Sequence, residues 1–186
     1  MQTRPLLSRL GVFGLVVIAG IAWYLRQQDA EAVDLQGYKQ REASASVCGY
    51  DLDLDGPEVE TLVAFGEEQG LRFPYTFAQV TAYLWLIGEL PDCYMTKSVA
   101  RGQGWKSAGT TVDDIDVSGA IGGDTFGNRE GRLPQRPRNR YVEADLDYVR
   151  GNRGAARLVF DRELTDRGFI WVTVDHYDSF ERIPEL

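Results

Sequence analysis

The segment Tyr141–Tyr148, YVEADLDY, is the feature that most restricts the fold of this 186-residue chain. Its residues alternate, with Val142, Ala144, Leu146 and Tyr148 on one side and Tyr141, Glu143, Asp145 and Asp147 on the other. A period of two predicts a half-buried β-strand. Two more strands are expected at RLVF (157–160) and FIWVTV (169–174), joined by DRELTDRG (161–168) as a hairpin loop. The C-terminal part is therefore expected to form an antiparallel sheet.

Helical patterns come before this sheet in the chain. A helix is expected at 57–68, with Asp55 or Gly56 as its cap and a proline in its first turn. Apolar residues at helical spacing predict a second helix from about Thr76 to Gly88. A short third helix, KSVARGQG, can begin after Thr96 as its cap, and TVDDID (111–116) fits one more helical turn. Helices followed by an antiparallel sheet predict an α+β fold, with the N-terminal helices packed on the C-terminal sheet.

Residues 1–26 are predicted to direct export, as a signal peptide or as an N-terminal membrane anchor. Arg4 and Arg9 precede an uncharged stretch, 10–25. That stretch is short for a membrane span of about 20 residues and long for a signal-peptide core of about 7–15 residues. A small-x-small cleavage site follows at AEA (30–32). Both alternatives stay open, and both send the rest of the chain out of the cytoplasm: secreted, periplasmic, or held on the outer side of the inner membrane.

The two cysteines, Cys48 and Cys93, fit an exported protein. An even pair of cysteines in an oxidising compartment favours a disulfide, and two unpaired thiols are the alternative. Their spacing matches no common zinc motif, and the single histidine of the chain could not complete such a site.

The net charge of −8 is unevenly distributed. Residues 1–26 carry +3, residues 27–90 carry −9 and residues 91–186 carry −2. Within 27–69 we expect an acidic extension, formed by a linker at Gln27–Ser46 and the extra helix at 57–68. In contrast, Arg129–Arg157 contains eight arginines against four acids. The forked guanidinium group suits phosphate, although a solvated, salt-bridged face would have the same composition.

The polar side of the predicted sheet collects a carboxylate, an imidazole and two guanidiniums. Glu143 faces away from Val142, while Arg153 and Arg157 follow across a tight loop. His176, the only histidine, is expected to close the last strand. If the strands are neighbours, this set suits cleavage of RNA by its own 2′-hydroxyl. The carboxylate would take the hydroxyl proton, the imidazole would protonate the leaving 5′-oxygen, and the guanidiniums would stabilise phosphoryl charge without a metal. A salt-bridge network without catalysis is the alternative.

Four blocks of the sequence resemble the barnase-like, guanyl-preferring bacterial ribonucleases, in that family's order and nearly its spacing. They are LPDCYMTKSVARGQGW (90–105), IGGDTFGNREGRLP (121–134), RYVEADLDYVRGNRGAARLVF (140–160) and VTVDHYDSF (172–180). The resemblance implies the microbial ribonuclease fold for a domain at 70–186, with no cofactor. It also implies cleavage of single-stranded RNA 3′ of guanine through a 2′,3′-cyclic phosphate.

The resemblance also implies catalytic roles for residues at matching positions. Glu143 matches the family's general base and His176 its general acid. Arg153 and Arg157 match the arginines that hold the scissile phosphate, and Lys97 matches the lysine that adds to this positive site.

The same resemblance implies a guanine-binding loop at Asn128, Arg129 and Glu130. Phe126 is expected to bind substrate beside this loop, and Tyr177 matches the aromatic residue near the substrate base. The Watson–Crick edge of guanine has two adjacent donors, N1–H and the 2-amino group, which one carboxylate such as that of Glu130 can accept. Adenine has no such donor pair, so the loop would discriminate between the two bases.

Two departures from the family keep a second hypothesis open. Gly127 stands where close relatives carry a small hydroxyl residue, and the acidic extension is additional. A membrane-tethered module that binds RNA or an inhibitor and has lost turnover would explain both. As an enzyme, the protein is expected to be a monomer with RNA as substrate, and the family analogy suggests a barstar-like inhibitor protein as a partner.

Overall fold

Helices come first and most of the sheet follows in the computed structural model, so the α+β prediction is confirmed. The helices are α2 (Leu35–Glu42), α3 (Pro57–Glu68), α4 (Pro74–Ile87) and α5 (Lys97–Gly102). The strands are β1 (Tyr94–Met95), β2 (Ala120–Thr125), β3 (Tyr141–Asp145), β4 (Arg157–Asp161), β5 (Ile170–Thr173) and β6 (Glu181–Arg182).

The structure describes residues 33–45, 48–106, 119–148, 153–163 and 169–184. The expected signal or anchor at 1–26 and the expected helical turn at 111–116 lie outside these ranges. Within them, no helix has the length and apolar character needed to cross a bilayer. Residues 34–186 make up one compact unit.

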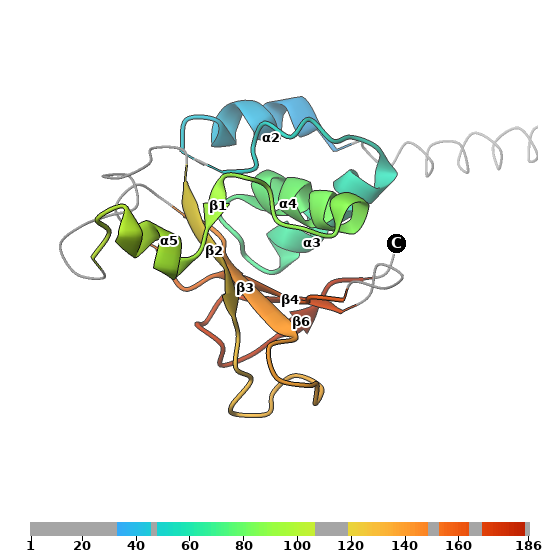
Figure 1. The fold of residues 1–186 in the computed structure, drawn as a ribbon. Helices are drawn as coiled ribbons and strands as arrows, with labels where there is room; N and C mark the ends of the chain where they lie inside the picture. Colours follow the sequence, from blue (N-terminus) through green and yellow to red (C-terminus); the bar gives the residue numbers. More distant parts are fainter. Residues whose placement is uncertain (1–32, 46–47, 107–118, 149–152, 164–168, 185–186) are drawn as a thin grey trace, which may run out of the picture. The chain divides into compact units, whose positions relative to one another are not determined.

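The six strands form one sheet in chain order, from β1 to β6 (Figure 1). β1 pairs with β2 in parallel, and every other neighbouring pair is antiparallel. The three expected strands are β3, β4 and β5. The sequence patterns do not predict β1 and β6, which have two residues each, or β2, which contains two glycines that weaken strand propensity. A bulge at Gly123, whose φ is 91°, bends β2 beside the middle of β3.

The alternation in β3 correctly separates two faces, but the strand is buried on both of them. The face that carries Glu143 also carries an apolar cluster of Leu133, Tyr141, Val159 and Trp171. Four partly buried aromatic residues pack on that cluster: Phe126, Phe169, Tyr177 and Phe180. Loops therefore cover the side that the sequence predicts to be solvated, so the charged groups there need partners.

The predicted helices α3, α4 and α5 are confirmed, with small changes at their ends. α3 has the expected bounds, and its N-cap is Gly56, which has a φ of 102°. α4 begins at Pro74, two residues earlier than expected, because proline suits the first turn of a helix. The Thr96 side chain caps α5 by accepting a hydrogen bond from the Val99 N–H, at 3.2 Å.

The prediction that Gln27–Ser46 is a linker is wrong for its described part, because α2 occupies residues 35–42. Glu42, at the end of α2, is only 3% exposed. Its carboxylate accepts hydrogen bonds from the backbone N–H groups of Tyr75 and Thr76, at 2.9 and 2.7 Å, and so caps α4. Burial raises the pKa of Glu42. This contact joins residues 33 positions apart, so no local pattern in the sequence could predict it.

The acidic extension belongs to the helical layer. Lys39 forms an ion pair with Asp53, and the Tyr38 hydroxyl donates a hydrogen bond to Glu67. Figure 1 shows α2, α3 and α4 on one side of the unit and the loop between β2 and β3 on the opposite side. The negative charge of α3 is therefore placed away from the base-binding loop that the sequence predicts.

Cys48 and Cys93 form a disulfide with a Cα–Cα distance of 5.6 Å. Replacing both by serine is expected to lower the free energy of unfolding by about 2–4 kcal/mol, because the bond constrains a long loop of the unfolded chain. Urea unfolding followed by tryptophan fluorescence measures this difference, and the parent under reducing conditions serves as a control that should behave like the double variant. Equal urea midpoints for the double variant and the oxidised parent would contradict the prediction.

Candidate active site

Glu143 lies in the middle of β3, and its side chain is 11% exposed. The Lys97 ammonium is 2.5 Å from its Oε1 atom, and the Tyr177 hydroxyl donates a hydrogen bond to its Oε2 atom at 2.7 Å. Lys97 is the first residue of α5, and its backbone N–H donates to Asp124 on β2 at 2.8 Å. The bulge in β2 thus helps to fix the start of α5. The ammonium and the hydroxyl supply the counter-charge and hydrogen bond that a buried carboxylate requires.

Tyr177 connects the carboxylate to the aromatic cluster. Its ring stacks on Phe126, with 5.1 Å between ring centroids, while its hydroxyl reaches Glu143. Burial, and then the hydrogen bond to Glu143, raise the pKa of Tyr177, and the nearby Arg157 opposes that rise. Tyr177 is expected to lie near the substrate base, and its hydroxyl also contacts Glu143, the candidate general base, directly.

The prediction that His176 closes the strand at 169–174 is wrong. β5 ends at Thr173, and His176 lies exposed in the loop to β6, with its ring centroid 4.8 Å from that of Tyr177. Both residues have a positive φ, 60° and 77°, which non-glycine residues adopt only when their surroundings impose it.

Asp175 provides this constraint. Its carboxylate accepts hydrogen bonds from the Ser179 hydroxyl at 2.6 Å, the Ser179 N–H at 2.9 Å and the Thr173 hydroxyl at 2.8 Å. These bonds, the Ser179 hydroxyl first, lower the pKa of Asp175 to about 2. The stabilisation is therefore complete above the ordinary aspartate pKa of about 4 and is lost as the pH falls through about 2. The loop that presents His176 is held in place throughout the neutral range.

Arg153 and Arg157 share one buried carboxylate, that of Asp145. Arg153 donates two hydrogen bonds to it, from Nε at 2.7 Å and from Nη2 at 2.9 Å. The Arg157 Nε atom is 3.0 Å from Oδ1, and its Nη1 atom donates to the Ala156 carbonyl at 2.6 Å. The Arg157 side chain is only 4% exposed, whereas that of Arg153 is 29% exposed. Arg153 is therefore the more accessible cation for a substrate phosphate.

The sequence predictions did not include Asp145 among the site residues. The alternation of β3 already places it on the same face as Glu143, and the strand register sets it directly opposite Arg157. The signal was thus present in the sequence, but only pairing between strands shows which residue the carboxylate meets.

Replacing Asp145 by asparagine is expected to lower the free energy of unfolding by about 3–5 kcal/mol. The substitution removes the counter-charge of two guanidinium groups, the buried one of Arg157 and the partly buried one of Arg153. Urea unfolding gives the value. Asp178→Asn is the matched control: its carboxylate is 81% exposed and 3.6 Å from Arg132, so a change below about 1 kcal/mol is expected. Similar losses in the two variants would show that Asp145 does not act as a buried counter-ion.

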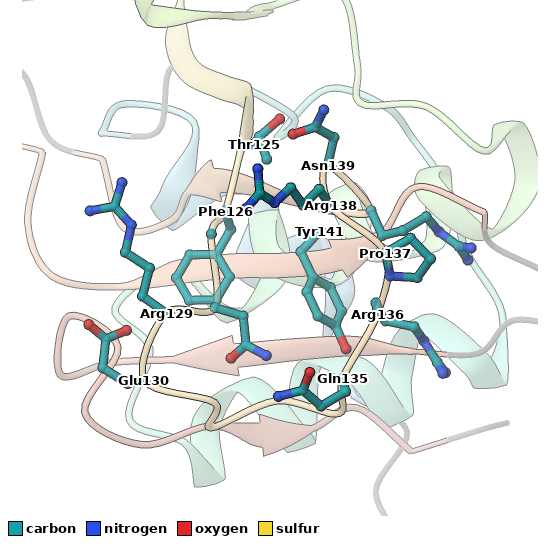
Figure 2. Close-up of a pocket in the computed structure, with 13 residues that line it drawn as sticks. Thr125, Phe126, Arg129, Glu130, Gln135, Arg136, Pro137, Arg138, Asn139 and Tyr141 are labelled. Atoms are coloured by element: carbon teal, nitrogen blue, oxygen red, sulfur yellow. The ribbon is translucent and has the colours of Figure 1, made fainter.

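The predicted guanine-binding residues lie in the loop between β2 and β3 (Figure 2). Asn128 has a φ of 42°, and its side chain holds the loop closed by donating to the Leu133 carbonyl at 2.8 Å and accepting from the Leu133 N–H at 3.0 Å. The Asn128 side chain is thus engaged within the loop, while Arg129 and Glu130 are exposed at its tip. Of the predicted residues, these two present side chains that a base can reach.

Phe126 links this loop to Tyr177, and through its hydroxyl to Glu143, because the Phe126 ring stacks on Tyr177 and also meets Phe180 edge-on at 5.8 Å. The geometry of the loop does not require a glycine at position 127, where close relatives carry a small hydroxyl residue. A Cβ atom added there would lie 3.5 Å from the Arg129 Cγ atom, an ordinary contact. A side chain at this position is therefore compatible with the same loop conformation.

Comparison with known proteins gives the following matches. A family model described as ribonuclease matches residues 79–184. A ribonuclease of Bacillus intermedius is 39% identical over 126 residues, which are 68% of this chain and 75% of that protein. A ribonuclease of Heyndrickxia coagulans is 43% identical over 108 residues, 58% of this chain and 95% of that protein. Among solved structures, ribonuclease Sa2 with guanosine-2′-cyclophosphate is 34% identical, with a TM-score of 0.29, over 33% of this chain and 63% of that chain.

Proposed function

This chain belongs to the ribonuclease family, and we propose that it is an exported endoribonuclease that cleaves single-stranded RNA on the 3′ side of guanine. The observation that carries the proposal is the buried Glu143 carboxylate, set between the Lys97 ammonium and the Tyr177 hydroxyl. It lies on the same sheet face as the Asp145–Arg157 pair, and His176, the only histidine of the chain, directly precedes Tyr177.

In the proposed reaction, the first step uses a nucleophile that the substrate itself carries. Glu143 accepts the proton of the guanosine 2′-hydroxyl, and the 2′-oxygen forms a bond to phosphorus. The bond between phosphorus and the 5′-oxygen of the next nucleotide breaks as the 2′,3′-cyclic phosphate forms. Each carboxylate oxygen has two lone pairs, so Glu143 can accept this proton while its contacts with Lys97 and Tyr177 persist.

His176 acts on the other side of the phosphate. The leaving 5′-oxygen takes a proton from the imidazolium, which its exposed position in the loop after β5 leaves accessible. Arg153, Arg157 and Lys97 stabilise the negative charge that develops on the phosphoryl oxygens. Water then opens the cyclic phosphate, with Glu143 and His176 exchanging their roles as acid and base.

Base selection belongs to the loop between β2 and β3. The exposed Glu130 carboxylate accepts from N1–H and the 2-amino group of guanine, and backbone N–H groups of the loop meet O6. The Phe126–Tyr177 stack supports the base beside the catalytic group. Export rests on the charge and hydropathy pattern of residues 1–26.

The test is cleavage of the dinucleotides GpU and ApU by the full chain, with and without EDTA. GpU is expected to be cleaved with a kcat/KM at least 10²-fold above that for ApU, since the adenine edge leaves the Glu130 carboxylate without its donors. EDTA is expected to have no effect, because the proposed reaction needs no metal. Equal cleavage of ApU would overturn the guanine preference, inhibition by EDTA would overturn the mechanism, and RNA binding without cleavage would favour a module that has lost turnover.

A further inference from the structure

The sheet face that carries Glu143 has a second arginine cluster, which the proposed reaction does not use. The side chain of Asp161 on β4 is 1% exposed and accepts hydrogen bonds from two arginines of the loop between β2 and β3. The Arg136 Nε atom is 3.2 Å from its Oδ2 atom, and the Arg140 Nε and Nη2 atoms are each 2.7 Å from its Oδ1 atom. As at Asp145, one buried carboxylate holds two guanidiniums.

The strand register places the two clusters at opposite ends of one ladder. Asp145 lies opposite Arg157, and Tyr141 lies opposite Asp161, in the pairing of β3 with β4. Both rows are on the face of Glu143, because their positions on β3 differ from residue 143 by two. Four residues of antiparallel strand correspond to about 14 Å, at about 3.4 Å per residue. A single phosphate cannot contact both clusters, so the second cluster would meet a different phosphate of a bound strand.

An open groove runs beside the second cluster (Figure 2). One of its arms is 125–130, which includes the predicted guanine-binding residues, and the other is 135–141. Figure 2 shows Arg129 and Glu130 on the first arm and Arg136 and Arg138 on the second. In the part of the chain that the structure describes, Arg129 and Arg138 are exposed and have no ion pair. The groove keeps a net positive charge even after Asp161 and Glu163, which contacts Arg140 at 3.1 Å, are counted.

The second arm is held in a defined conformation. Pro137 fixes one of its φ angles, and Pro134 fixes that of the residue directly before the arm. The Tyr141 hydroxyl donates to the Pro134 carbonyl at 2.7 Å, and the Arg140 N–H donates to the Pro137 carbonyl at 3.3 Å. Arginines on a fixed turn lose less conformational entropy on binding than arginines on a free loop, so the arm is suited to binding a phosphate.

We propose that Arg136 and Arg138, with Arg140 and the buried Asp161 behind them, form a second phosphate-binding subsite for the RNA segment 5′ of the cleaved guanosine. The inference rests on the proposed function. A guanine bound in the loop would place its 3′-phosphate near Lys97, Arg153 and Arg157. None of these three residues lines the groove. The strand that runs from the loop toward the groove is therefore the 5′ segment.

The experiment compares kcat/KM for GpU, for the 5′-extended UpUpGpU and for the 3′-extended GpUpU. In the variant Arg136→Ala/Arg138→Ala, we expect kcat/KM for UpUpGpU to fall about tenfold through KM, the effect of one charge-assisted contact. Values for GpU and GpUpU should stay within twofold of the parent. The control Arg41→Ala/Arg72→Ala removes the same charge from the helical layer and should change none of the three. Equal losses on all substrates, or a loss confined to GpUpU, would overturn the proposal.

A binding measurement separates this proposal from the proposed function. UpUpGpU with a 2′-deoxyguanosine cannot be cleaved by the proposed reaction, and fluorescence anisotropy gives its Kd. The Arg136→Ala/Arg138→Ala variant should bind it about tenfold more weakly, with a salt dependence reduced by about one phosphate contact. If the parent cleaves no RNA but this arginine dependence persists, the subsite stands and the proposed function fails. If the parent cleaves GpU but its Kd and KM for the extended strands match those of the variant, the subsite is overturned.

Discussion

His176→Ala is expected to lower kcat for GpU cleavage by about 10²–10⁴-fold, the usual contribution of a positioned general acid. No other histidine in the chain can replace it. The loss should fall mainly on kcat, because His176 is proposed to act on the leaving 5′-oxygen rather than on the guanine base. Steady-state kinetics on GpU, with circular dichroism to verify folding, measures the effect.

A substrate with a better leaving group gives a sharper test of the same residue. If His176 protonates the leaving oxygen, a guanosine 3′-(4-nitrophenyl phosphate) diester, whose leaving phenoxide needs no proton, should restore most of the lost rate. Val174→Ala is the control, since Val174 lies exposed in the same loop, and its kcat should stay within about twofold of the parent. A variant His176→Ala that cleaves GpU as fast as the parent would remove the imidazole from the mechanism.

Glu143→Gln is expected to lower kcat/KM for GpU by a similar factor, about 10²–10⁴-fold. The substitution keeps the size of the side chain, and the amide can still form hydrogen bonds with its two neighbours, the Lys97 ammonium and the Tyr177 hydroxyl. What it removes is the capacity to take the 2′-hydroxyl proton. The diagnostic measurement is therefore kcat/KM on two substrates, GpU and the nitrophenyl diester.

The nitrophenyl diester distinguishes the two variants, since it bypasses the acid but not the base. Glu143→Gln should remain impaired on this substrate while His176→Ala recovers. Asp178→Asn has the same change in charge at an exposed position and should leave kcat/KM for both substrates unchanged. A parent-like rate for Glu143→Gln, or recovery of both variants on the diester, would contradict the assignment of Glu143 as the base.

The elements that the sequence predicts well are those with strong local signals. Helix α3 begins where Pro57 follows Gly56, and α5 begins where Thr96 can cap it, so both follow from a few neighbouring residues. The central strand β3 follows from its alternation. Glu143 and the arginines also lie close together in the chain, so their convergence on one face could be predicted once the strands were assumed to be neighbours.

The elements that the sequence does not predict depend on distant contacts. Helix α2 is tied to α4 by the buried Glu42, and strands β1 and β6 exist only through pairing with longer neighbours. The loop position of His176 was also missed, because the hydrogen bonds of Asp175 rather than strand pairing hold that segment. Local propensity says little about such groups, since their stabilisation comes from residues that are remote in sequence or from side-chain hydrogen bonds.

Local patterns in the sequence are enough to predict the α+β class, the central strand with its two faces, and the chemical groups of the site: one imidazole, two carboxylates on β3 and many arginines. The partner that each charged group meets follows from the packing of residues that are distant in the chain. Asp145 holds Arg153 and Arg157 at one end of the face, and Asp161 holds Arg136 and Arg140 at the other. Burial explains this dependence, because a charge removed from water must find an opposite charge or a hydrogen bond, and packing of the loops on the sheet selects which one is within reach.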